Sequence, residues 1–153
     1  MVRTKNSNLN VTLGYDEKSY LNELMATNTT NSAYNIKNLV LGLSGNAFDN
    51  LGGMAVSNGS VSITFGNLEI LPTSINGYGT YTPARFNKLS FSGSRNQSWD
   101  EEEKSSVFLA ISGQLASANL NSGEQFYLGG PYAVRAYPVS QGGGSQGLVA
   151  TLE

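Results

Sequence analysis

Apolar and polar residues alternate with a period of two in six stretches of the chain. This alternation predicts β-strands, each with one apolar and one polar face. The apolar positions are Leu9, Val11, Leu13 and Tyr15 in the first stretch, Leu39, Leu41 and Leu43 in the second, Val61, Ile63 and Phe65 in the third, Leu89, Phe91 and Gly93 in the fourth, Val107, Leu109, Ile111 and Leu115 in the fifth, and Leu148, Ala150 and Leu152 in the sixth. The expected fold class is all-β.

Residues 16–25 fit two interpretations. Tyr20, Leu21, Leu24 and Met25 have helical spacing, with Asp16 as a candidate helix cap. The same residues also fit an extension of the first strand that leads into a loop, and we favour this second interpretation.

The polar faces of the predicted strands carry small, uncharged residues, chiefly Ser, Thr, Asn, Gly and Gln. A soluble sheet that faces water usually carries Lys, Glu and Arg there. A large transmembrane β-barrel can place small polar residues toward a wet lumen while its apolar face meets lipid. The alternation alone leaves a soluble β-sandwich or solenoid with one buried face equally open.

Composition narrows the chemistry that the chain can perform. It has 153 residues, 9 of them basic and 11 acidic, so the net charge is −2. That balance does not indicate a nucleic-acid partner. The chain has no Cys and no His, which excludes disulfides, zinc sites with these ligands and His-dependent catalytic triads. We expect no metal and no cofactor.

Neither end of the chain resembles a targeting segment. There is no basic and apolar leader at the N-terminus, and the longest apolar run, residues 39–43, is too short for a transmembrane helix. Both ends interrupt a strand-like pattern, so we expect a fragment of a larger protein.

The connections between the predicted strands alternate in length. Residues 49–53 and 98–104 are short, whereas residues 71–83 and 121–146 are long. Short turns on one side and long loops on the other are typical of outer-membrane barrels.

One acidic run raises the alternative of an enzyme. Glu101, Glu102 and Glu103 follow Trp99 and Asp100, and paired carboxylates can hydrolyse glycosides. A charged run in one short connection usually forms a solvated turn, and no carboxylate pair lies on convergent strands. We therefore predict that the protein is not an enzyme.

The long segment from residue 124 to residue 153 is unusually rich in large side chains for a loop. It contains Phe126, Tyr127, Leu128, Tyr132, Val134 and Tyr137, together with the cation of Arg135. Such a loop is expected to fold onto another surface, although ordinary packing of a surface loop stays open. An Arg held away from water needs an acidic partner.

Within this segment a motif resembles that of a known family. The residues are Leu128, Gly129, Gly130, Pro131, Tyr132, Ala133, Val134, Arg135, Ala136, Tyr137 and Pro138. They are similar to the LGG-x-x-x-VR-[AG]-[YF] core of the lid loop in two-partner-secretion outer-membrane transporters, the haemolysin secretion/activation family of the ShlB/FhaC/HecB type. Residues 113–120, 86–89 and 94–97 also resemble family strands, and a weaker similarity extends back to about residue 9.

The resemblance implies a partial antiparallel transmembrane β-barrel over residues 1–153, with a lid loop at 121–146, about six strands of a larger barrel, and no POTRA domains or last strands. It implies secretion of a large β-helical haemolysin or adhesin through a monomeric pore embedded in outer-membrane lipid of a bacterium. Arg135 is expected to pair with an Asp in an F-x-D-x-G motif on a later strand. Lumen-facing positions would be Ser90, Ser92, Ser94, Ser112 and Gln114.

Two other functions stay open at this point. A barrel-insertion factor of the same superfamily would share the fold and the loop. A soluble, β-rich surface or adhesin fragment would share the alternation but would be expected to show internal repeats, which the sequence lacks.

Overall fold

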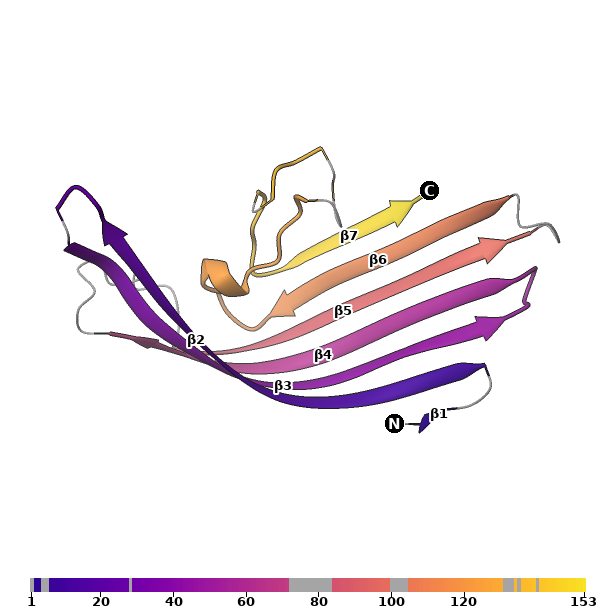
Figure 1. Ribbon diagram of the computed structural model, residues 1–153, viewed down its shortest axis with the longest axis horizontal. Coiled ribbons are helices and arrows are strands. Elements are labelled where there is room, and N and C mark those ends of the chain that lie inside the picture. Colours follow the sequence, from indigo (N-terminus) through magenta and orange to yellow (C-terminus); the bar gives the residue numbers. More distant parts are fainter. Residues whose placement is uncertain are drawn as a thin grey trace.

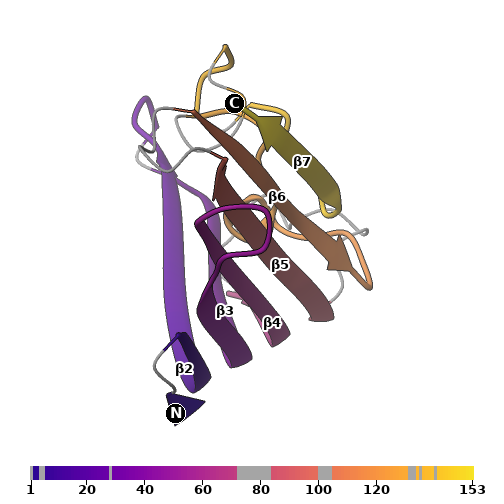
Figure 2. The same cartoon turned by 90° about the vertical axis from the view of Figure 1, so that its right-hand side faces the viewer.

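The strands form one antiparallel sheet in which neighbours in sequence are neighbours in space (Figures 1 and 2). The computed structural model describes residues 2–3, 6–27, 29–71, 84–99, 105–130, 134, 136–139 and 141–153. The strands are β1 (Val2–Arg3), β2 (Ser7–Leu24), β3 (Thr29–Asp49), β4 (Ala55–Ile70), β5 (Arg85–Ser98), β6 (Ser106–Ala116) and β7 (Gly147–Leu152), and η1 (Ser122–Glu124) is a 3-10 turn. No α-helix occurs in these ranges, and none of their segments is a helix that could cross a membrane.

The six strands predicted from alternation are confirmed as β2 to β7, in an open, all-β sheet consistent with part of a β-barrel. The interpretation of residues 16–25 as strand is also confirmed, because β2 runs to Leu24 and the helical alternative is wrong. Pairing with β3 explains this extension, since Tyr20 lies opposite Tyr34 and Leu21 opposite Ala33. Helical spacing within β2 is overruled by this ladder of backbone hydrogen bonds.

The register places the predicted apolar residues on one common face. One row across the sheet consists of Leu13, Leu41, Ile63, Leu89 and Leu115. Many of these side chains are exposed, including Leu13 at 71% and Tyr15 at 65%. A broad exposed apolar face of this kind marks a surface that meets another apolar medium or partner.

Ionic groups bound this apolar face at both ends of the strands. At the short-turn end the Arg95 guanidinium holds Asp49, with both Nη–Oδ distances at 2.8 Å. At the opposite end Lys37 Nζ lies 3.7 Å from carboxylate oxygens of both Glu17 and Glu69. The apolar residues therefore form a band between two polar borders.

The other face of the sheet is concave and divides into two regions. Toward the short turns it is hollowed and lined by small residues such as Asn10, Ser60 and Ser112. Toward the long connections it carries a small apolar cluster of Tyr34, Ile36, Leu68 and Phe86. This cluster interrupts the small polar pattern expected for the face, because the connection that follows β6 packs against it.

Candidate functional site

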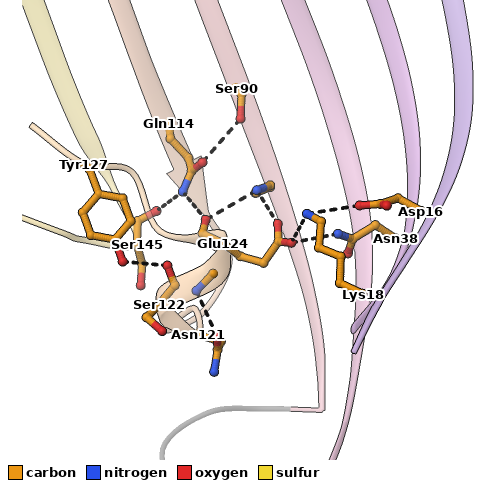
Figure 3. Close-up of polar contacts among 12 residues, drawn as sticks. Asp16, Lys18, Asn38, Ser90, Gln114, Asn121, Ser122, Glu124, Tyr127 and Ser145 are labelled. Carbon is orange, nitrogen blue, oxygen red and sulfur yellow. Dashed lines mark hydrogen bonds and ion pairs between the residues drawn. The ribbon is translucent and has the colours of Figure 1, made fainter. Parts of the chain in front are cut away.

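The connection between β6 and β7, residues 117–146, turns back over the concave face of the sheet (Figure 1). Its first half carries η1, whose last residue, Glu124, points into the sheet (Figure 3). The Glu124 side chain is 2% exposed. A carboxylate this deeply buried requires charged or hydrogen-bonding partners.

Three strands supply the partners of the Glu124 carboxylate. Lys18 Nζ on β2 lies 2.9 Å from Oε1, and Lys88 Nζ on β5 lies 2.5 Å from Oε2. Asn38 on β3 donates a third hydrogen bond, from Nδ2 to Oε1, at 2.9 Å. We call Glu124 with Lys18, Lys88 and Asn38 the Glu124 anchor.

The anchor joins parts of the sheet that are distant along its surface. Lys88 shares a register row with Gly14, which is four residues before Lys18 and three strands away. On a flat sheet these two lysine positions would be roughly 20 Å apart. Both ammonium groups nevertheless reach one carboxylate, because the sheet is curved. Figure 3 shows the Lys18 side chain extending over the concave face toward Glu124.

The charges of the anchor balance locally. Lys18 also lies 3.1 Å from an Asp16 oxygen, so two ammonium groups face two carboxylates. Burial by itself raises the pKa of the Glu124 carboxyl, but hydrogen bonds from Lys88 and Lys18 outweigh burial and hold that pKa below its ordinary value of 4.5. Glu124 is therefore ionised at neutral pH.

Further contacts fix the backbone around Glu124. Gln114 on β6 donates from Nε2 to the Glu124 carbonyl at 3.1 Å. The Tyr34 hydroxyl donates to Asn121 Oδ1 at 3.0 Å, and the same oxygen accepts from Gly123 N, which caps η1. Leu120, 4% exposed, packs into the apolar cluster. Residues 120–124 are thus held by one hydrophobic contact, one ionic cluster and several hydrogen bonds.

The second half of the connection folds back on the first as an irregular hairpin. Phe126 and Gly144 exchange both backbone hydrogen bonds, at 2.8 and 2.9 Å. Gly129 N donates to the Gln141 carbonyl at 3.2 Å, and Val134 N donates to the Leu128 carbonyl at 2.9 Å. The described residues of the sequence motif, 128–130, 134 and 136–138, therefore lie at the far end of this hairpin.

Two motif positions require glycine for different reasons. A Cβ on Gly129 would lie 2.1 Å from the Pro138 carbonyl oxygen, which belongs to the opposite arm of the hairpin. Gly130 has φ 125°, in the region that other residues rarely adopt. Close packing of the two arms thus depends on these glycines.

The positions predicted from the sequence lie in two places. Ser90, Ser92, Ser94, Ser112 and Gln114 lie on the same face of the sheet as the anchor, and Ser90 donates to Gln114 Oε1 at 3.5 Å. The motif residues Leu128, Val134, Ala136 and Tyr137 are exposed at the far end of the hairpin. Pro131, Tyr132 and Arg135 lie outside the described residues, and so does the acidic run at 101–103.

Sequence reasoning missed the Glu124 anchor. Its signal was present in the polar faces, since Lys18 and Lys88 are two of the few charged residues on faces that are largely uncharged. The pairing of β2 with β3 has a bulge between Asn22 and Glu23. Between this bulge and the short turns, the concave face of β2 to β7 carries three charged side chains, those of Asp16, Lys18 and Lys88. All three belong to the anchor or touch it.

The described part of the chain contains no group of three His, Cys, Asp or Glu residues that could hold a metal ion. The anchor has one carboxylate and two ammonium groups, and the Asp16 carboxylate beside Lys18 brings their summed charge to zero. Such an arrangement fixes a loop in place.

The family model described as haemolysin secretion/activation protein ShlB/FhaC/HecB matches residues 1–151. No curated protein and no solved structure matches the chain.

Proposed function

Because this chain belongs to the ShlB/FhaC/HecB family of haemolysin secretion/activation proteins, we propose that its sheet is part of an outer-membrane pore that secretes one large partner protein of the haemolysin or adhesin type. The family is one of two-partner secretion transporters of the outer membrane. The partner would cross unfolded through the lumen that the concave face helps to line, and it would fold outside as a β-helix. The mechanism is conduction without catalysis.

The observation that carries this proposal is the packed β6–β7 connection. A sheet whose concave face served only as a core would fill that face with apolar side chains. Here the part of the face toward the short turns is hollow and lined largely by small polar side chains. The part toward the long connections is covered by one loop, which the Glu124 anchor holds in place. A wet pore with a displaceable lid has this arrangement.

The apolar band supports a membrane-spanning role. One ionic border lies in the register row of Arg95, which meets β2 at Ser7, and the other lies in the row of Glu17 on the same strand. The two borders are therefore ten residues apart along β2, or about 34 Å. At a strand tilt near 40° this length spans about 26 Å of membrane, and barrels in outer membranes have an apolar band of about 25 Å.

Three further parts of the proposal rest on the family resemblance. Residues 121–146 act as a lid, and Arg135 locks this lid by pairing with an Asp of an F-x-D-x-G motif on a later strand. Residues 1–153 form a partial barrel domain whose remaining strands complete a single monomeric pore. The wall residues Ser90, Ser92, Ser94, Ser112 and Gln114 give the partner a surface with few charges to retain it.

A comparison of secreted proteins tests this function. The gene that carries the chain is disrupted and then restored, and mass spectrometry quantifies the proteins of the culture medium and of the outer membrane. We expect one large β-rich protein to leave the medium on disruption and to return on restoration. An unchanged medium would contradict the proposal. A joint loss of many outer-membrane barrels would indicate a barrel-insertion factor instead.

A further inference from the structure

The Glu124 anchor contains a binding site whose natural ligand is a carboxylate. Glu124 reaches this site from a loop, whereas its three side-chain partners lie on strands of the sheet. Removing the loop would therefore take away one carboxylate and leave the ammonium groups and the Asn38 amide in place. The site is built into the wall, and the chain's own glutamate fills it.

Displacement of the loop would change the charge of the wall. With Glu124 bound, Asp16, Lys18, Lys88 and Glu124 sum to zero charge. Without Glu124 the same place carries a net charge of +1, since only Asp16 then opposes the two lysines. Lys88, whose side chain is 16% exposed behind the carboxylate, would lose its ion-pair partner.

The surroundings favour a peptide carboxylate over other anions. Beyond the anchor and Asp16, the concave face presents hydroxyl and amide groups such as Ser60, Ser92 and Asn46, and it carries no further charged side chain on β2 to β7 between the bulge at Asn22 and the short turns. An extended chain that slides along this part of the strands can hydrogen-bond through its backbone anywhere, but it finds positive charge only at Lys18 and Lys88, which outweigh Asp16 once Glu124 is displaced. Asp and Glu side chains are the groups of such a chain that fit there.

We propose that Lys18 and Lys88 form a carboxylate-binding site that Glu124 occupies while the loop is packed and that acidic side chains of the secreted partner occupy once the loop is displaced. The inference rests on the proposed function, because it requires a partner chain in the lumen. Exchange of one carboxylate for another would keep the lysines paired throughout. An acidic segment of the partner would thereby compete with Glu124 and favour the displaced loop.

Ion currents through the complete barrel test the site. Residues 121–146 are replaced by a short Gly-Ser linker, the pore is placed in a planar bilayer, and a ten-residue oligoglutamate peptide is added. We expect the peptide to block the current, and oligoglutamine and oligolysine of equal length to block it far less. The double variant K18Q/K88Q should need about tenfold more oligoglutamate for the same block, because two solvent-accessible ion pairs are lost.

The control is Lys37→Gln, which removes a lysine on the opposite face of the sheet whose exposure, 41%, is close to the 39% of Lys18. It should leave the block unchanged. Equal block of the parent pore and of K18Q/K88Q, or equal block by oligolysine, would overturn the inference. A properly assembled barrel that carries no current would contradict the proposed pore itself, so the two failures are distinguishable.

A second variant avoids the deletion. Glu124→Gln in the otherwise complete protein frees the lysines while the loop stays present. We expect oligoglutamate to block this variant at lower concentration than it blocks the wild-type pore. Equal sensitivity of the two would contradict a site that Glu124 normally fills.

Discussion

Replacing Glu124 by Gln tests how strongly the anchor holds the β6–β7 connection. Gln keeps the shape of the side chain and a hydrogen-bond acceptor for Asn38, but it removes the charge that faces Lys18 and Lys88. The substitution leaves Lys88, 16% exposed, without its ion-pair partner, whereas Lys18 is 39% exposed and keeps Asp16.

The magnitude follows from the burial of each pair. Breaking a fully buried ion pair from one side costs about 3–5 kcal/mol, whereas an exposed pair contributes about 0.2–1 kcal/mol. The Lys88 pair lies between these limits and the Lys18 pair near the lower one, so we expect a total of about 2–3 kcal/mol. This free energy shifts the equilibrium between packed and displaced connection by about 30- to 140-fold.

The absence of cysteine from the chain makes the shift measurable. Leu120, a residue of the connection that is 4% exposed where it packs against the sheet, is replaced by Cys in the wild-type and Glu124→Gln backgrounds, and the rate at which this Cys reacts with a maleimide is recorded. Where opening and closing are fast, this rate follows the displaced fraction. The cysteine weakens packing equally in both backgrounds, so the ratio of rates reports on Glu124.

Glu69→Gln is the matched control. Its carboxylate is 57% exposed and lies 3.7 Å from Lys37, so it should change the rate by less than about threefold, as expected for a surface pair. A Glu124→Gln ratio as small as that of the control would refute the view that the ion pairs hold the connection.

Three further outcomes are expected. Because the Glu124 pKa is lowered by Lys88 and Lys18, the anchor should be fully formed above pH 4.5 and lost as the pH falls further. The rate of maleimide labelling of the Leu120→Cys variant, measured with a reagent calibrated at each pH, should therefore rise only in acid, and Glu124→Gln should abolish that rise. Gly129→Ala should open the hairpin of the connection, because the added Cβ would lie 2.1 Å from the Pro138 carbonyl oxygen. Increased proteolysis between residues 128 and 141 checks this expectation. The control is Gly14→Ala, because position 14 has free space for a Cβ. Arg135→Ala should reduce secretion of the partner and increase open-pore current, and normal secretion with a normal current would contradict the proposed lock.

The strands could be predicted from the sequence because apolar and polar side chains lie on opposite faces of the sheet. This contrast creates the period of two in residues such as Leu39, Leu41 and Leu43. The contrast fades beyond the apolar band. Near Ser19 and Asn35, the outer parts of β2 and β3 are strands because they pair with each other. The local sequence there has no clear alternation that would predict this pairing.

The anchor could not be predicted because its members are far apart in the chain. Lys18 and Lys88 lie 106 and 36 residues from Glu124, and only the register of the intervening strands brings them together. Glu124 itself follows β6 in a loop without periodicity. The charges of Lys18 and Lys88 stand out on a largely uncharged face, but nothing in the sequence indicates their partner.

The hollow of the concave face lies on the short-turn side of Glu124, lined by residues such as Ser44, Ser94 and Thr151. In the barrel proposed above, the packed connection would therefore cover only the mouth at the long connections and leave a vestibule open at the mouth near the short turns. A partner chain could enter this vestibule before anything moves. Loading would then precede opening, and the membrane would stay sealed until a chain is already inside to fill the gap.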